Sequence, residues 1–124
     1  MAREPRQALG TRGEDLAAAE LERQGMVILD RNWRCRVGEI DIVAMDLGAG
    51  NRSLVFCEVK CRAGLGFGSP LEAITYAKVR KLRQLAGEWL AASDITAQRI
   101  RIDAVGVVLL PHEEPQLTHL RGIG

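Results

Sequence analysis

The sequence predicts one α/β domain of the α+β type, in which a mixed sheet is flanked by helices. Two observations predict this fold class. Segments with helical and with strand-like apolar patterns follow one another in the order α-β-β-β-α-β. Hydrophobic residues make up 47% of the 124-residue chain and charged residues 27%, which is typical of a globular domain of this length. We expect a single domain over residues 1–124, with its core at about 10–110 and a looser C-terminal tail.

Two helices are predicted from composition and apolar spacing. The first covers residues 13–24, which are rich in helix formers and carry an apolar stripe that includes Leu16 and Leu21. Gly25 follows and suits the residue after a helix end. The second helix begins near residue 71 or 75 and ends near 92. Its apolar face contains Val79, Leu82, Ala86 and Trp89, so Trp89 is expected in the core.

Strands are predicted where apolar and polar residues alternate or where β-branched residues are enriched. Turn-forming composition separates them at residues 46–53, in a glycine-rich loop at 64–70 and at a break at 111–115. The predicted strands cover about residues 26–29, 36–45, 53–62 and 99–110, with a candidate edge strand at 116–120.

Charge and cysteine content argue against several classes of protein. A net charge of +1 disfavours tight nonspecific DNA binding, which needs many phosphate contacts. No apolar run approaches the roughly 18 residues of a membrane span, and no apolar segment follows the charged N-terminus as in a secretory signal. Cys35, Cys57 and Cys61 fit no zinc motif and are expected to be reduced thiols. We therefore expect a cytoplasmic protein with no membrane partner.

The strongest functional pattern lies in the two strand segments at 36–45 and 53–62. Side chains two residues apart share one face of a strand. If these strands pair symmetrically across residues 46–53, apolar residues face one another near the turn and charged residues at the far end, although a slip of one residue would reverse the faces. The predicted opposed pairs are Met45 with Leu54, Val43 with Phe56, Asp41 with Glu58, and Glu39 with Lys60.

The charged end of this hairpin predicts metal-assisted phosphodiester hydrolysis. Opposed Asp41 and Glu58 would have Cβ atoms about 5 Å apart, so that one carboxylate takes up a proton or a cation lies between them. A hard divalent cation such as Mg²⁺ binds through one or two carboxylates and keeps several waters. Lys60, on the same face, can stabilise charge on the phosphate or help to activate the water. The alternative is a solvent-facing edge on which Glu39 and Lys60 form an ordinary cross-strand pair.

Basic residues form three groups, at residues 31–36, 60–62 and 78–83. Such groups are usually solvated faces, so a role in nucleic-acid binding requires them to converge on one site. The residues predicted to bind nucleic acid are Lys78, Lys81, Arg62, Arg34 and Arg36. Trp33, which lies among arginines, is the better candidate of the two tryptophans for stacking on a base.

Several segments together resemble a known family. They are GEIDIVA at residues 38–44 and LVFCEVK at 54–60, with Gly13-Glu14 and Arg31-Asn32 upstream and Arg101-Ile102-Asp103 downstream. From about residue 10 to 108, the chain resembles the YraN family of predicted endonucleases. That family belongs to the PD-(D/E)xK, restriction-endonuclease-like superfamily and is distantly similar to archaeal Holliday junction resolvases. Cys57 stands where the family pattern has valine.

The resemblance implies a restriction-endonuclease-like α-β-β-β-α-β core, a Mg²⁺ or Mn²⁺ cofactor and a set of roles. Asp41 and Glu58 resemble the metal ligands, with the carbonyl of Val59 as a third. Lys60 resembles the catalytic lysine. Glu14 resembles a helix glutamate that supports the metal or its waters.

Three acidic residues have an alternative to a role in the metal site. Glu14 could instead be an acid in the first helical turn that interacts with the helix N-terminus. Glu39 either adds to the acidic cluster or pairs with Lys60. Asp103 is expected to be a structural partner for an arginine rather than a ligand.

Two functions are consistent with the sequence. The first is a divalent-metal nuclease acting on DNA, with branched DNA as a candidate substrate. The second is a non-catalytic module on the same fold that binds nucleic acid or a protein. The small size and near-neutral charge keep the second open, because affinity could depend on a homodimer or a protein partner.

Overall fold

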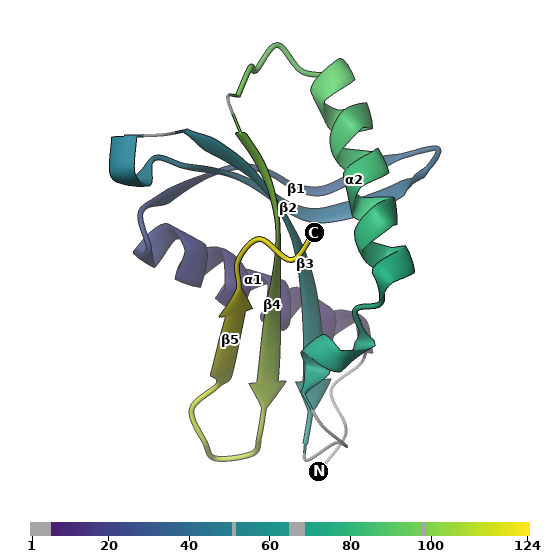
Figure 1. Ribbon diagram of the computed structural model, residues 1–124. Coiled ribbons are helices and arrows are strands. Elements are labelled where there is room, and N and C mark those ends of the chain that lie inside the picture. Colours follow the sequence, from purple (N-terminus) through teal and green to yellow (C-terminus); the bar gives the residue numbers. More distant parts are fainter. Residues whose placement is uncertain (1–5, 51, 65–68, 98) are drawn as a thin grey trace.

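The chain forms a five-stranded mixed sheet with one helix on each face (Figure 1). A computed structural model describes residues 6–50, 52–64, 69–97 and 99–124. Helix α1 (Arg6–Arg23) lies behind the sheet in this view and helix α2 (Tyr76–Ala91) lies in front. The predicted fold class is confirmed. The strands are β1 (Met26–Cys35), β2 (Gly38–Asp46), β3 (Ser53–Ala63), β4 (Arg99–Leu109) and β5 (Gln116–Leu120).

The strands lie side by side in their order along the chain. β3 and β4 pair in parallel from Ser53↔Arg99 to Ala63↔Leu109, whereas the other neighbours are antiparallel. A parallel pair needs a crossover connection. Here a short 3-10 helix η2 (Pro70–Ala73) and α2 supply it. The 3-10 helix η1 (Gly48–Gly50) lies in the predicted turn between β2 and β3.

The two sheet faces bury separate cores, as alternation along the strands requires. On the α1 face, Ile42 and Val55 pack with Leu21. On the α2 face, Phe56 packs with Leu82 and Trp89. The rings of Phe56 and Trp89 meet edge to face with centroids 5.8 Å apart, so the predicted core position of Trp89 is confirmed. Trp33 is half-buried and packs against the same cluster.

Two predicted boundaries are wrong. Helix α1 begins at Arg6, not near residue 13, because Leu9 packs against the core on the α1 face and holds the preceding turns in the helix. Strand β1 extends to Cys35 instead of ending near residue 29, because its polar second half pairs with the start of β2. The ladder is irregular between Ile28 and Asp30, and Asn32 has a φ of 53°. Both features break the alternation by which a sequence reveals a strand. In the predicted glycine-rich loop, residues 65–68 lie outside the described residues.

A buried ionic network fixes the C-terminal strand to the sheet. Asp103 of β4 has an exposed fraction of 0%, and its carboxylate accepts hydrogen bonds from Arg101 Nε at 2.8 Å, His119 Nε2 at 2.7 Å and Gly122 N at 3.0 Å. Burial by itself would raise the pKa of Asp103, but these donors hold it below its usual value. Arg101 also donates to Asp46 of β2 at 2.9 Å. The prediction that Asp103 is an arginine's partner is therefore confirmed.

The C-terminal segment, which we expected to be looser, is hydrogen-bonded to the sheet. β5 pairs with β4 from Ala104↔Leu120 to Val108↔Gln116, and Ile123 N donates to Ile102 O at 2.8 Å. Within the described ranges, no helix is both long and apolar enough to cross a membrane.

Candidate active site

The site lies where β2 and β3 stop pairing. Their ladder runs from Asp46↔Ser53 to Ile42↔Cys57 and includes the predicted pairs Met45↔Leu54 and Val43↔Phe56, so the predicted register is confirmed over this stretch. Among the described residues the ladder ends one position before Asp41 and Glu58. Asp41 Oδ2 instead accepts a hydrogen bond from Val59 N at 2.8 Å. The Asp41 side chain thus takes the place of a backbone contact at the point where the strands separate.

Glu58 is the most buried acid of the site, with an exposed fraction of 5%. Its Oε1 lies 3.5 Å from Lys60 Nζ and 3.5 Å from Lys78 Nζ. Lys60 follows two residues later on β3, whereas Lys78 reaches the carboxylate from the first turn of α2. A buried charge needs compensation, and here two half-buried ammonium groups supply it. Sequence spacing could predict the Lys60 contact, whereas the Lys78 contact depends on how α2 packs.

Asp41 has a strongly perturbed acidity. Burial is the largest cause and the nearby Glu58 carboxylate is the next; together with Glu14 and Glu39 they raise the pKa of Asp41 to about 7, against the opposing effect of the Val59 N–H. This set of causes indicates that the four acids converge on one region. The Asp41 carboxyl therefore keeps its proton to a higher pH than an ordinary aspartate, and its ionised form is stabilised by a positive partner.

Glu14 joins the cluster from the opposite sheet face, on the middle of α1. Burial raises its pKa, and the Glu39 and Glu58 carboxylates add to the increase while Arg31 opposes it. Because α1 begins at Arg6, the interpretation of Glu14 as a first-turn acid is wrong. The preceding Gly13 brings the helix against β3: a Cβ on Gly13 would lie 2.6 Å from Cys61 Cβ. This close approach carries Glu14 towards the strands.

Replacing Gly13 by alanine is expected to lower the free energy of unfolding by about 1–3 kcal/mol, because the new methyl group must push α1 away from β3. Gly10→Ala is the matched control, since a Cβ at Gly10 meets no atom within 4 Å. That change should raise stability by up to about 1 kcal/mol through helix propensity. Thermal unfolding of both variants checks this prediction, and equal stabilisation by the two changes would contradict it.

Asn32 links two of the acids and was missed by sequence reasoning. With its amide nitrogen facing the carboxylates, Asn32 donates to Glu14 Oε1 at 2.6 Å and to Glu39 Oε1 at 3.1 Å. Its positive φ places the side chain there, and asparagine tolerates that conformation better than most residues. Glu39 also pairs with Arg34, with 3.3 Å between Oε2 and Nε. The β2–β3 ladder ends before the position at which Glu39 would oppose Lys60.

The other predicted basic residues lie on three elements. Arg34 and Arg36 are exposed at the end of β1 and in the turn to β2. Lys81 of α2 lies against that hairpin, since its Cε is 3.6 Å from the position of a Cβ on Gly38. Arg62 of β3 is half-buried and opposite Val108. Lys60 and Lys78 form ion pairs with Glu58, and Arg34 pairs with Glu39.

The donor set fits a hard cation held mainly by water and few protein ligands. Among the described residues, no three His, Cys, Asp or Glu side chains gather closely enough to hold a metal ion alone. Mg²⁺ commonly uses one or two carboxylates and keeps its remaining waters. Asp41 and Glu58 supply two carboxylates whose mutual repulsion is already visible in the raised pKa of Asp41. A divalent cation between them would relieve it.

Comparisons with known proteins identify relatives of the chain. The family described as "Uncharacterised protein family UPF0102" matches residues 13–107. A UPF0102 protein of Mycobacterium ulcerans is 48% identical over 119 residues, which are 96% of each chain. One of Mycobacterium avium is 50% identical over 116 residues, covering 94% of this chain and 89% of the relative.

One solved structure is also similar to the chain. It is Archaeoglobus fulgidus Hjc, a Holliday junction resolvase, which aligns with a TM-score of 0.46 and 20% identity over 90% of this chain and 86% of its own. The sequence relatives match nearly the whole chain, including both segments of the hairpin. This chain belongs to the uncharacterised protein family UPF0102.

Proposed function

We propose that this protein is a divalent-metal-dependent nuclease that hydrolyses phosphodiester bonds of DNA. One observation carries the proposal: buried Glu58 lies beside Asp41 and holds the ammonium groups of Lys60 and Lys78 on the same carboxylate oxygen. Two repelling carboxylates with lysines beside them are suited to a cation and an anionic phosphate in contact. The resemblance of the hairpin sequence to predicted endonucleases agrees with this chemistry.

Each side chain of the site would have a separate role in hydrolysis. Asp41 and Glu58, with the carbonyl of Val59, would hold Mg²⁺ or Mn²⁺. The ion would supply Lewis-acid polarisation of the phosphate and a water of lowered pKa. Glu14 and Glu39 would orient waters next to the ligands. Lys60 would place its ammonium beside the scissile phosphate, where negative charge increases in the transition state.

The basic residues around the acidic cluster would hold the DNA backbone. Lys78 lies in the site, and Lys81, Arg34, Arg36 and Arg62 extend the positive charge along α2, the β1–β2 hairpin and the end of β3. Each phosphate contact contributes to affinity in a salt-dependent way. A limited number of phosphate contacts suits a DNA that is held over a short stretch, and branched DNA is one candidate substrate.

Calorimetric titration with Mn²⁺, followed by cleavage of a panel of branched and linear DNAs, tests the proposal. Wild type should bind Mn²⁺ and cleave at least one DNA only in its presence. Glu58→Gln should lose both Mn²⁺ binding and DNA cleavage, because a neutral amide is a poor ligand for a hard cation. Glu88→Gln, an exposed change on α2, is the matched control. Mn²⁺ binding that survives loss of Glu58 would move the metal elsewhere, and DNA binding without any cleavage would favour the non-catalytic binding module.

Lys78→Ala is expected to slow cleavage less than loss of Lys60 does, and the defect should shrink at low salt. The reason is that Lys78, in this proposal, contacts a phosphate next to the cleaved bond and not the scissile phosphate itself, and salt screens such a contact. Cleavage rates of the variant and of wild type at about 10 mM and about 150 mM salt measure the effect. A defect that is independent of salt would show that Lys78 takes part in the chemical step.

A further inference from the structure

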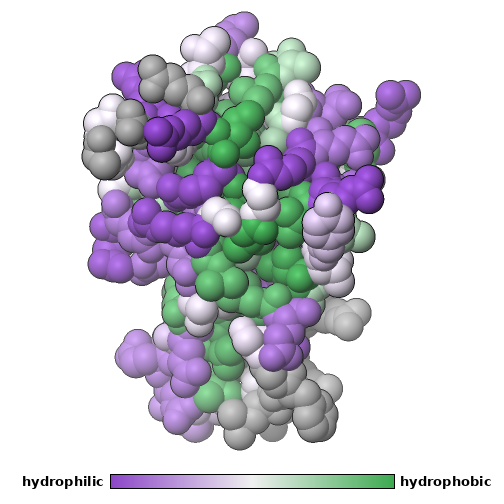
Figure 2. All heavy atoms as spheres, viewed as in Figure 1, coloured by the Kyte–Doolittle hydropathy of each residue, from purple (hydrophilic) through white to green (hydrophobic). Residues whose placement is uncertain are grey.

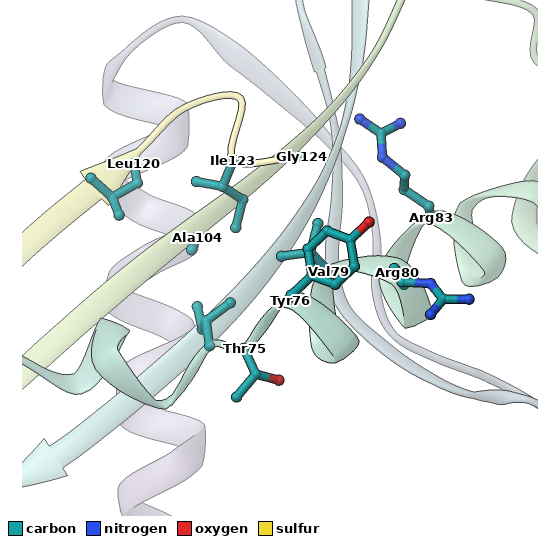
Figure 3. Close-up of a pocket in the computed structure, with 10 residues that line it drawn as sticks. Thr75, Tyr76, Val79, Arg80, Arg83, Ala104, Leu120, Ile123 and Gly124 are labelled. Carbon is teal, nitrogen blue, oxygen red and sulfur yellow. The ribbon is translucent and has the colours of Figure 1, made fainter.

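A second concave site lies on the other side of α2. It is a cavity of about 410 Å³ between the first half of α2, strands β4 and β5, and the segment after β5 (Figure 3). Val79, Ala104, Leu120 and Ile123 form its apolar walls. Figure 2 shows hydrophobic side chains gathered along the middle of this face, with hydrophilic ones on both sides. The cavity size is that of a pocket for a small organic group.

The α2 residues of the cavity recur at the spacing of one helix face. Tyr76, Val79, Arg80 and Arg83 line it, at positions i, i+3, i+4 and i+7. The residues by which α2 packs on the sheet, Leu82, Leu85 and Trp89, lie on a different face and are buried. The cavity face of α2 therefore contributes little to holding the helix in place.

Two features of this face are unusual for a surface that contacts only solvent. Tyr76 exposes 80% of its surface, although the tyrosine ring is a large apolar group. Arg80 and Arg83 lie within one helical turn of each other beside an apolar cavity, and Figure 3 shows both guanidinium groups on the α2 side of it. An aromatic ring, an apolar cavity and two guanidinium groups together match a ligand that is flat and aromatic at one end and anionic at the other.

We propose that this cavity binds one unpaired nucleotide of a DNA strand, with its base against Tyr76 and the apolar walls and its phosphate on Arg80 and Arg83. This inference rests on the proposed function and specifies its substrate class as DNA with a single-stranded segment next to the cleaved bond. In intact duplex DNA each base is stacked and paired and does not enter such a cavity.

The position of Lys78 connects the cavity with the acidic cluster. Lys78 lies between Tyr76 and Val79 in sequence, but its side chain reaches Glu58 on the sheet side of α2. A strand that crosses the first turn of α2 can therefore place one nucleotide in the cavity and a neighbouring phosphate at Lys78. The positive end of the helix dipole at that turn adds a favourable field for phosphate.

The test uses binding without cleavage, so that its result does not depend on nuclease activity. Fluorescence anisotropy in EDTA compares a labelled duplex that has a single-stranded overhang with the same duplex made blunt. Tyr76→Ala should weaken binding of the overhang DNA by about tenfold, the usual effect of removing one aromatic stacking partner, and leave the blunt duplex unchanged. Tyr76→Phe keeps the ring and should bind within about twofold of wild type. Arg83→Gln should lower the salt dependence by about one phosphate contact, whereas Arg99→Gln, at the exposed start of β4, should not.

Photo-crosslinking of an overhang that carries 5-iododeoxyuridine locates the contact directly. The crosslinked peptide should contain Tyr76. Unchanged binding of the overhang by Tyr76→Ala, or a crosslink only outside the cavity, would overturn the inference while leaving metal-dependent cleavage intact. A crosslink at Tyr76 in a protein that cuts no DNA would support the nucleotide site and reject the proposed nuclease. If Tyr76→Ala changes only the molar mass measured by light scattering, the cavity binds a second copy of the chain and the inference is wrong.

Discussion

Lys60→Ala should lower the rate of DNA cleavage by about 10²–10³, the typical effect of losing one preorganised contact to charge that develops in a transition state. Substrate binding should weaken only by one phosphate contact. Affinity for Mn²⁺ should hold or rise, because Lys60 Nζ lies 3.5 Å from Glu58 Oε1 and competes with a cation for that oxygen. Single-turnover cleavage and Mn²⁺ calorimetry separate these effects.

Two further variants test whether the effect belongs to Lys60 itself. Lys60→Arg should fail to restore activity, since guanidinium is bulkier and does not give up its proton. Arg99→Ala, which removes an exposed cation at the start of β4 and outside the proposed DNA-binding residues, is the matched control and should keep most of the activity. If Lys60→Ala cleaves as fast as wild type a DNA that wild type cuts, the nuclease assignment of the β2–β3 hairpin is wrong.

The two lysines on Glu58 also predict a non-additive effect on stability. Replacing either lysine alone by alanine leaves the buried carboxylate with the other lysine as a partner. The free energy of unfolding of each single variant should therefore fall by at most about 1 kcal/mol. The double variant leaves Glu58 without a lysine partner and should lose about 1–3 kcal/mol more than the sum. Urea unfolding of the four proteins in EDTA gives this coupling, and strict additivity would show that the lysines do not share Glu58.

Asp41→Asn should abolish cleavage and yet stabilise the metal-free protein. The amide oxygen can still accept the hydrogen bond from Val59 N, while the buried charge next to Glu58 is removed. The free energy of unfolding in EDTA should therefore rise by about 1–3 kcal/mol near neutral pH, in line with a carboxyl whose pKa is shifted by several units. The stabilisation that Mn²⁺ gives wild type by mass action should be lost.

The stability gained by Asp41→Asn should depend on pH, because the pKa of Asp41 is about 7, above the value of 3.8 for an unperturbed aspartate. Between these values the folded state binds more protons than the unfolded state, so wild-type stability falls as pH rises through this window. The amide of the Asp41→Asn variant cannot titrate, so the advantage of the variant should be small near pH 4 and full above about pH 7. Thermal unfolding across this range in EDTA measures it. An advantage that grows towards acid pH would contradict the environment described for Asp41.

The parts of the fold predicted well from sequence are those governed by local pattern. Residues 53–62 alternate and are flanked by turn composition, and β3 is found at Ser53–Ala63. The register of the β2–β3 hairpin followed from the same alternation, because a one-residue slip would have buried charge. Asp41 and Glu58 could therefore be predicted as neighbours, although the backbone ladder ends just before them.

Features governed by distant contacts could not be predicted. The partners of Asp103 include His119 and Gly122, and no local pattern links them to β4. The second half of β1 reads as a loop, since its polar side chains and the positive φ at Asn32 hide the strand. The Asn32 bridge between Glu14 and Glu39 depends on that irregular backbone. The role of Gly13 likewise depends on which strand lies beneath the helix.

The ionic network around Asp103 has a consequence for how the chain acquires its structure during synthesis. It joins side chains that are far apart in sequence: Asp46 of β2, Arg101 of β4, and His119 of β5, which in turn contacts Gln24 after α1. Contacts of such large separation form late and slow the folding of β-rich chains. A nascent chain that has reached only β4 carries an aspartate whose His119 and Gly122 partners are still unmade. The five-stranded sheet is therefore completed only after residues 116–122 have left the ribosome.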